Sequence, residues 1–256
     1  MSTLTMRYVE REARVFARLW RGSVFSSFVA PALMLGALGI GLGSLINERN
    51  DGVEGLTYIQ FVAPGLLAAT VMNVAVNECM WPVMGGHKWS RQYHAMVAAP
   101  LTPASVYHGV VTWAGVRVAM SAAAFLLVAA LLGGVKSPWG VLAFPAAILT
   151  GLAFAAMMAA FSITQDDDLK FPLIVRLGVQ PLFLLSGTFF PVRELPRGIR
   201  WMVWLSPLWH GVELCRAACL GEFHPTRAFI NIAVLVVFVA VGAHWGRATF
   251  ARRLAS

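Results

Sequence analysis

Six long stretches of this sequence carry no Asp, Glu, Lys or Arg, and they limit what the chain can fold into. Most reach the roughly 20 residues that an α-helix needs to cross about 30 Å of hydrocarbon. Charged residues make up only 12% of the 256 residues, about half the share in a soluble domain. Because an open sheet in lipid would leave backbone groups unpaired, we expect an all-α membrane protein with six transmembrane helices. The expected spans are residues 24–46, 56–80, 105–132, 139–164, 171–191 and 227–247.

The segment before the first expected span, residues 1–21, is rich in arginine. Five arginines recur at spacings of four, three, four and three, which places them on one stripe of a helix. We therefore expect an N-terminal amphipathic helix in the plane of the inner leaflet, with its arginines toward lipid phosphates. A solvated tail that carries the usual cytoplasmic positive charge is the alternative. The long charged start and the length of the following apolar run do not fit a signal peptide.

A second amphipathic segment, residues 88–99, is expected between the second and third spans as one short helix that ends before Pro100. A helix outside the membrane with large aromatic side chains is suited to dock in a partner's groove. Packing of this helix on the protein's own spans is the alternative. The helical repeat places Trp89, Tyr93, Met96 and Val97 on one face, whereas Arg91 and His94 face elsewhere.

Residues 192–222 combine tryptophan and arginine as neither an ordinary loop nor an ordinary span would. This composition predicts a re-entrant helical hairpin between spans five and six, anchored at headgroup depth on the outer side. The rings of Trp201, Trp204 and Trp209, together with Phe189 and Phe190, could also stack on a sugar or aglycone. An aromatic belt at the outer interface explains them more simply.

Three further features in or beside the spans are candidate functional residues. Arg117 lies within the third span, where an arginine is costly and indicates a function; snorkelling or pairing with a neighbouring span would explain it too. Thr188, Phe189 and Phe190 lie at the polar end of the fifth span and are candidate gate residues if two copies face each other. The three aspartates at residues 166–168 indicate a solvated turn or an acidic contact with a partner.

Motifs for catalysis are missing from the sequence. It has no G-x-x-x-x-G-K-[ST], so it cannot bind ATP as P-loop proteins do, and it has no H-E-x-x-H or G-x-S-x-G. His210 and Glu213, one helical turn apart, could hold a metal, but a helix cap or a salt link to Arg216 explains them more simply, so we expect no metal. Three cysteines provide no disulfide framework, although a bridge between Cys215 and Cys219 stays open.

The net charge of +8 comes mainly from arginines at the ends of the spans. This distribution fits contact with anionic lipid headgroups rather than with nucleic acid. Inner segments of the six-span topology hold more Lys and Arg than outer segments, which predicts that both termini are cytoplasmic.

Several motifs resemble one family. Residues 183–191 read F-L-L-S-G-T-F-F-P, residues 194–196 read E-L-P and residues 206–216 read S-P-L-W-H-G-V-E-L-C-R. Together they resemble the permease subunit of type-2 ABC exporters, in particular the nodulation-factor, lipooligosaccharide and daunorubicin-type drug exporter permeases. The likeness extends to G-L-T-Y-I-Q-F-V-A-P-G-L-L at Gly55–Leu67 and to L-T-G-L-A-F-A at Leu149–Ala155.

The resemblance implies half of a dimeric pore, formed with a second copy or a related permease, in a bacterial cytoplasmic membrane. It implies that residues 88–99 are the coupling helix, which seats on an ABC ATPase present in two copies. ATP and Mg would be bound by that partner. The implied cargo is amphiphilic: a lipid-linked saccharide, a glycolipid or a hydrophobic drug. An acidic residue of the outer helices in the family matches Glu213 here.

Two other classes of function remain as alternatives. One is a lipid-modifying membrane enzyme with His210 and Glu213 as its site. The other is an ion-coupled carrier, which would need buried acidic residues in the middle of a span.

Overall fold

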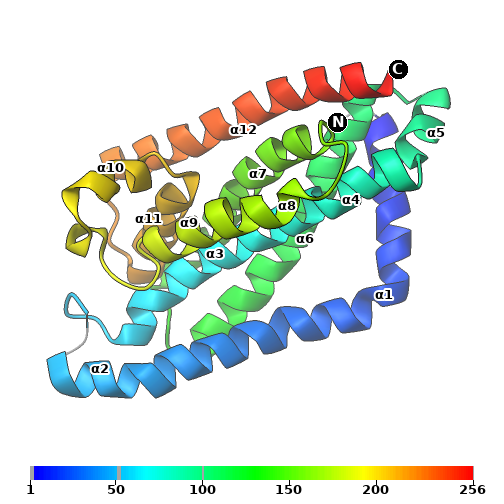
Figure 1. Ribbon diagram of the computed structural model, residues 1–256. Helices are drawn as coiled ribbons and strands as arrows, with labels where there is room; N and C mark the ends of the chain where they lie inside the picture. The colour runs from blue at the N-terminus through cyan, green and yellow to red at the C-terminus, as the bar shows by residue number, and fades with distance from the viewer. Residues whose placement is uncertain (1–2, 51–52, 100, 256) are drawn as a thin grey trace.

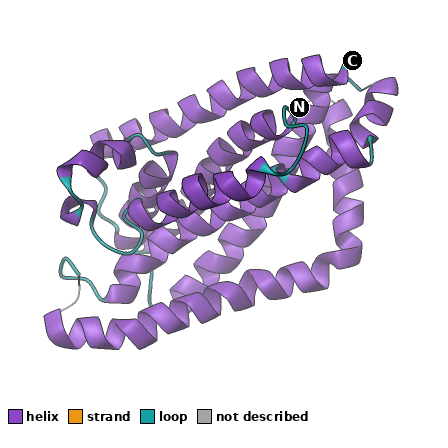
Figure 2. Cartoon of the chain, in the orientation of Figure 1, coloured by secondary structure: helices purple, strands orange, loops and turns teal. Residues whose placement is uncertain are grey.

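The computed structural model describes residues 3–50, 53–99 and 101–255; among these, the side chains of residues 3, 4, 19–27, 30, 40 and 47–50 are not described. Nearly all of the described chain is helical, as the composition predicts (Figure 1, Figure 2). The long helices are α1 (Thr3–Leu35), α3 (Tyr58–Cys79), α6 (Pro103–Leu131), α7 (Ala143–Ser162) and α12 (Pro225–Leu254). The shorter ones are α2 (Gly43–Asn50), α4 (Trp81–Met84), α5 (Gln92–Ala98), α8 (Lys170–Ile174), α9 (Gln180–Leu185), α10 (Arg197–Trp204) and α11 (Pro207–Leu220). Three π-helical segments (Gly36–Leu42, Gly85–Trp89, Val175–Val179) and two 3₁₀ segments (Pro138–Leu142, Val192–Glu194) complete them.

Four helical stretches of the described chain are long and apolar enough to cross a membrane. They are Tyr58–Trp89, Pro103–Leu131, Pro138–Ser162 and Pro225–Leu254. These match the second, third, fourth and sixth spans expected from the sequence. The mean hydropathy of each stretch is so high that, in water, these helices would expose large apolar surfaces.

The first and fifth expected spans differ from the prediction. Helix α1 continues through Gly36–Leu42 into α2, so the expected N-terminal helix and first span form one continuous helix, which turns a corner along its length (Figure 1). The helix of the fifth segment ends at Leu185 rather than at residue 191. It ends there because Gly187 adopts a φ of 83°, which a helix cannot continue.

The core of the bundle is formed where α3, α6, α7, α11 and α12 pack together (Figure 1). Small residues allow the close approach. A Cβ on Gly151 of α7 would lie 2.5 Å from Val118 of α6, and a Cβ on Gly242 of α12 would lie 2.7 Å from Ala156 of α7. Tight contacts of this kind replace the hydrophobic effect as the force that joins helices in lipid.

The segment expected as one helix over residues 88–99 is broken. Ser90 ends the π-helical segment, and Arg91 takes a left-handed backbone with a φ of 50° before α5 begins. Helices α10 and α11 occupy the segment 192–222, joined by a turn at Leu205 and Ser206. Of these two, α11 is a core helix packed against α3, α7 and α12.

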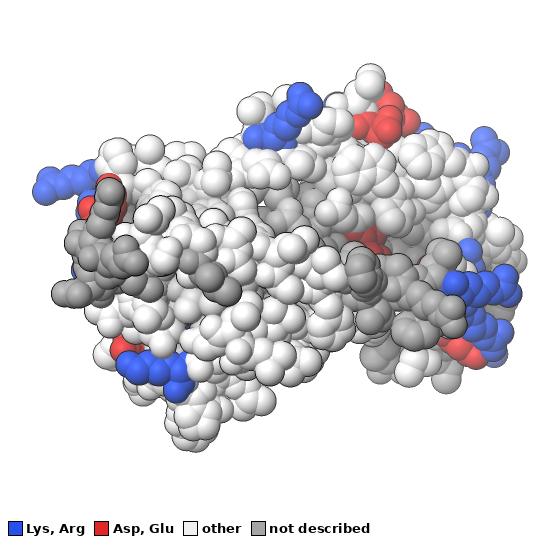
Figure 3. Space-filling model, turned by 90° about the horizontal axis from the view of Figure 1, so that it is seen from below, with Lys and Arg blue, Asp and Glu red and all other residues white. Residues whose placement is uncertain are grey.

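Lys and Arg side chains are unevenly spread over the surface of the molecule. In Figure 3, uncharged atoms cover the centre of the visible face, whereas the Lys and Arg side chains lie around its edge. The three cysteines, Cys79, Cys215 and Cys219, are free and buried, so the bridge between Cys215 and Cys219 does not form.

Candidate functional site

The chain leaves α9 through a bend at residues 186–190, which lies directly against α3. Thr188 is completely buried, and a Cβ on Gly65 of α3 would lie 2.7 Å from the Cα of Thr188. The two backbones therefore touch. Thr188, a candidate gate residue, fixes the bend to α3 and has no free surface for a substrate in this conformation. The other two gate candidates, Phe189 and Phe190, are half-buried, and the ring of Phe189 packs edge-to-face on Phe183 of α9 at 5.0 Å.

Arg216 of α11 ties this bend to two helices. Its Nη2 donates hydrogen bonds to the backbone oxygens of Gly187, at 2.7 Å, and Phe61, at 3.3 Å. Its Nη1 forms an ion pair with Glu213 at 3.3 Å, and the guanidinium lies 4.2 Å above the ring of Phe61. The salt link between Glu213 and Arg216 is thus confirmed. The contacts to the bend show that Arg216 also holds α11, α3 and the bend together.

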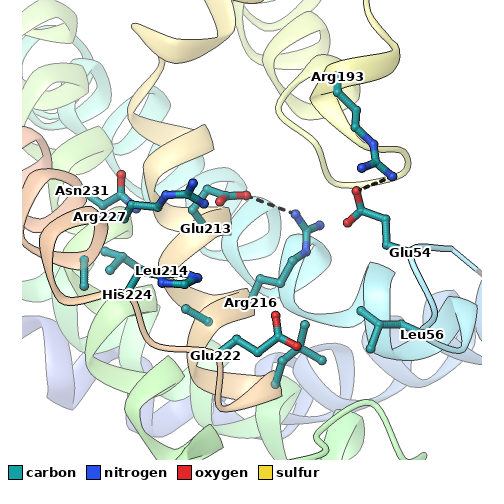
Figure 4. Close-up of a pocket in the computed structure, with 13 residues that line it drawn as sticks. Glu54, Leu56, Arg193, Glu213, Leu214, Arg216, Glu222, His224, Arg227 and Asn231 are labelled. Carbon is teal, nitrogen blue, oxygen red and sulfur yellow. Dashed lines mark hydrogen bonds and ion pairs between the residues drawn. The ribbon is translucent and has the colours of Figure 1, made fainter.

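Two adjoining cavities open beside Arg216, of about 410 and 510 Å³. Figure 4 shows the first, with charged side chains converging on it from the start of α12, from α11 and from the loop before α3. Glu54 of that loop pairs with Arg193 at 2.9 Å. The second cavity shares these residues and extends to Trp204 and Trp209. We call the second cavity the arginine cup.

His210, the other half of the suggested enzyme site, is occupied on both ring nitrogens. Its Nε2 lies 3.0 Å from the Trp204 carbonyl oxygen, to which it donates, and its Nδ1 lies 2.7 Å from the side chain of Asn231. A neutral imidazole fulfils both bonds if Asn231 presents its amide NH₂ group. His210 therefore joins α11 to α12 and is not free to act as a base, which weighs against the lipid-enzyme alternative. Among the described residues, no group of three His, Cys, Asp or Glu side chains could hold a metal ion.

A polar stripe on α3 faces a groove in the otherwise apolar bundle. Thr70, Asn73, Asn77 and Glu78 line this groove of about 400 Å³. The side-chain nitrogens of the two asparagines donate to carbonyl oxygens of their own helix, Asn73 to Ala69 and Asn77 to Asn73. These bonds leave the side-chain oxygen, Oδ1, of each asparagine available to a second molecule. We call this feature the polar groove.

Arg117 closes one side of the polar groove. Its Nε donates to Oε1 of Glu78 at 2.9 Å, and its guanidinium lies 4.5 Å from the centre of the Phe16 ring. Of the two interpretations drawn from the sequence, the structure shows pairing with a neighbouring helix. Arg117 nevertheless borders the groove, together with Met34 of α1 and Phe183 of α9, so it lies beside the polar side chains of α3.

At the end of the bundle opposite to α10 and the two cavities, the residues expected to dock a partner do not share one free face (Figure 1). Tyr93 is 1% exposed and packs against Tyr8 and Phe250, and burial raises the pKa of its hydroxyl. Met96 and Val97 also pack toward the core. The predicted shared face is therefore not free in this structure: after the left-handed turn at Arg91, Tyr93, Met96 and Val97 pack on the protein itself.

Two of the remaining candidates at this end lie outside the core. Trp89 is 65% exposed, and Arg91 is exposed too. His94 is half-buried and stacks on His87 with 5.1 Å between ring centroids. Of the candidate docking residues, Trp89 and Arg91 are thus the exposed ones.

Asp166 links this segment to the last helix. One oxygen, Oδ1, accepts from Nζ of Lys88 at 2.9 Å and from Nη1 of Arg253 at 3.2 Å. The hydrogen bond from Lys88, with Arg253 nearby, holds the pKa of Asp166 below its usual value. The exposed turn between α7 and α8 therefore connects Gly85–Trp89 with the end of α12.

Comparison with known proteins decides the family. A profile described as ABC-2 type transporter matches residues 4–220. The chain belongs to the ABC-2 type transporter family. It is 30% identical to Nodulation protein J of Rhizobium leguminosarum bv. viciae, over 91% of this chain and 88% of the relative. It is also 30% identical to Nodulation protein J of Neorhizobium galegae, over 92% of each chain. It is 26% identical to the inner membrane transport permease YadH of Escherichia coli, over 90% and 87%.

The resemblance seen in the sequence motifs is therefore confirmed. This ABC-2 permease is a multi-pass membrane protein and a transport subunit without a nucleotide-binding domain. Permeases of this family work with ABC ATPase subunits.

Sequence reasoning missed the polar groove of this permease. The available signal was the recurrence of Asn73 and Asn77 four residues apart inside an apolar run, followed by Glu78. The pairing of Glu78 with Arg117 required knowing that α3 and α6 are neighbours. The role of Arg216 was also missed, because its partners Phe61 and Gly187 lie far away in the sequence.

Proposed function

We propose that this permease forms the membrane half of an ATP-driven exporter that moves an amphiphile outward across the bacterial cytoplasmic membrane. The cargo is a lipid-linked saccharide, a glycolipid or a hydrophobic drug. The permease acts as a dimer, with itself or a related permease, on two copies of a separate ABC ATPase that supplies ATP and Mg²⁺.

The polar groove is the observation that carries this proposal. Asn73, Asn77 and Glu78 place hydrogen-bonding groups along an apolar helix, where polar side chains are costly unless they meet a partner. A path lined on one side by amides and on the other by apolar side chains such as Met34 and Phe183 suits a cargo with a polar head and an apolar tail.

The two ends of the bundle support the proposed orientation, with the ATPase at one end and the outer interface at the other. Trp89, exposed next to the Asp166 link, offers an anchor for the ATPase at one end. The link joins this anchor to α12, so a push on Trp89 reaches the bundle as a rigid-body movement. At the other end, α10 exposes Trp201 and Trp204, which fits a re-entrant segment at the outer interface.

The test is transport by the assembled complex. The permease and its ATPase are reconstituted in vesicles, and the ATP-dependent movement of a fluorescent glycolipid between leaflets is measured. The paired substitution Asn73→Leu/Asn77→Leu should abolish movement while leaving the fold intact, because both side chains bond only to carbonyls of their own helix. The control is Thr112→Val, the same polar-to-apolar change on α6 outside the groove. The proposal fails if the wild-type complex moves no glycolipid or drug, or if both variants transport equally.

A further inference from the structure

The arginine cup is a cavity of about 510 Å³, within the range of roughly 300–1,000 Å³ that small-molecule sites occupy. Aromatic side chains line part of its wall, and arginines line another part. The lining side chains that the argument uses are Arg193, Arg200, Arg216, Arg227, Trp204 and Trp209. They come from α10, α11, the start of α12 and the loop that follows the bend, so the cup forms only in the folded bundle.

Positive charge in the cup exceeds negative charge. Four arginines line it but only two carboxylates, those of Glu54 and Glu213. Glu54 is paired with Arg193 and Glu213 with Arg216, so each of these carboxylates is already engaged. Two guanidinium charges therefore have no carboxylate in the cup to balance them.

The two unbalanced arginines are Arg200 and Arg227. Arg200 donates to two backbone oxygens, that of Leu195 at 2.7 Å and that of Arg193. Neither oxygen carries a charge that would balance the guanidinium. Arg227 makes no hydrogen bond or ion pair with any part of the chain that the structure describes. It also lines the adjoining 410 Å³ cavity (Figure 4). Planar guanidinium groups bind oxyanions such as carboxylate, phosphate and sulfate with paired hydrogen bonds.

The aromatic part of the cup adds a second requirement. Trp204 and Trp209 present indole rings beside the arginines, whereas the ring of Phe61 is already covered by Arg216. An indole face packs well against the C–H face of a sugar ring, which is apolar on one side and rich in hydroxyls at its edge. The carboxylates of Glu54 and Glu213 can accept hydrogen bonds from such hydroxyls.

We propose that the arginine cup binds an anionic sugar unit. The ring of the sugar lies against Trp204 and Trp209, and its oxyanion group is held by Arg200 and Arg227. This inference rests on the proposed function only in assigning the sugar to the cargo and the cup to the outer side; the binding itself is independent of both.

Binding is tested on the full-length permease in nanodiscs of zwitterionic phosphatidylcholine, without ATPase and without transport. The probes are glucuronate and glucose 6-phosphate as anionic sugars, glucose as the neutral sugar, glycerol 3-phosphate as a lipid-headgroup mimic and inorganic phosphate alone. Calorimetry and quenching of tryptophan fluorescence give the affinities. We expect the anionic sugars to bind at least tenfold more tightly than the other three probes.

Substitutions locate the site. Arg200→Gln and Arg227→Gln should each weaken binding of the anionic sugars about tenfold, as expected for loss of a charge-assisted hydrogen bond. Trp204→Leu should weaken binding of glucose 6-phosphate but not of inorganic phosphate. The matched control is Arg197→Gln, which removes an arginine of α10 that does not line the cup; it should leave every affinity unchanged.

Each remaining outcome overturns the inference. If glucose binds as tightly as the anionic sugars, the oxyanion group is not recognised. If glycerol 3-phosphate or inorganic phosphate binds as tightly, the sugar ring is not recognised. An equal effect of Arg197→Gln means that only the overall charge matters, and absence of saturable binding removes the site. Because no ATPase is present, none of these results touches the proposed export activity, which the vesicle assay measures separately.

Discussion

Arg117 of α6 and Glu78 of α3 form an ion pair of 2.9 Å beside the polar groove, with 18% and 23% of their side chains exposed. In such surroundings the loss of one partner costs more than the loss of both, because the remaining charge is left without compensation. The pair therefore fixes α6 to α3 along the wall of the groove.

Glu78→Gln should destabilise the permease by about 1–3 kcal/mol, less than for a fully buried pair because water still reaches both groups. The double variant Glu78→Gln/Arg117→Gln should lose less stability than the two single variants combined. Thermal unfolding in detergent measures both, with Glu194→Gln as an exposed control. Additive losses would show that the pair does not contribute through its partnership.

Gly65→Ala tests the contact between α3 and the bend. The added Cβ would lie 2.7 Å from the Cα of Thr188, which is backbone and cannot move aside as a flexible side chain can. We expect a loss of about 1–3 kcal/mol in unfolding free energy and a strong loss of transport. Gly198→Ala is the matched control, because its Cβ would meet nothing within 4 Å. Normal stability of Gly65→Ala would mean that the bend is not packed on α3 as described.

Trp89→Ala tests the anchor at the ATPase end. Trp89 is 65% exposed, so its removal should leave thermal stability unchanged while weakening ATPase binding about tenfold or more, as for a tryptophan at the centre of an interface. Trp139→Ala, at a tryptophan that is 59% exposed in the Pro138–Leu142 segment, should change neither quantity. Tyr93→Ala should instead lower stability, because Tyr93 is buried. Unchanged ATPase affinity of Trp89→Ala would remove this residue from the interface.

The Asp166 link predicts a defined dependence on pH. Lys88 and Arg253 lower the pKa of Asp166 in the folded protein, so the link contributes above the unfolded value of about 4 and is lost as the pH falls through the lower folded value. At neutral pH it should therefore be intact, although salt should weaken it because Asp166 is exposed. Hydrogen exchange of residues 85–89, corrected for the intrinsic slowing of amide exchange at low pH, should rise below about pH 4.

Asp166→Asn should raise that exchange at pH 7, whereas Asp168→Asn, in the same turn but without these partners, should not. Equal exchange in the two variants would show that the link does not hold the segment.

The composition and the apolar runs were sufficient to predict an all-α membrane protein, and four of the expected spans coincide with long apolar helices. Length and polarity alone determine such helices in lipid. The end of the fifth helix at Leu185 depends on the left-handed backbone of Gly187, and the break at Ser90 and Arg91 depends on how Tyr93 packs against Tyr8 and Phe250. Local periodicity contains neither constraint.

In the candidate sites too, contacts within one helix could be predicted from the sequence, whereas contacts between helices could not. Glu213 could be paired with Arg216 from their spacing on one helix, and this pairing is confirmed. The polar groove and the arginine cup bring together residues that are far apart in the sequence, such as Glu78 with Arg117 and Glu54 with Arg193. Only the packing of the bundle places these side chains side by side.

The bundle should span the membrane with Trp89 on the ATPase side and α10 on the other. Single cysteines at Trp89 and at Leu205, which is 65% exposed, test it most directly, since the three native cysteines are buried. Labelling of sealed cells and of inside-out vesicles with a membrane-impermeant maleimide gives the side of each. We expect Leu205→Cys to react only from outside and Trp89→Cys only from inside. Reaction of both positions from the same side would contradict it.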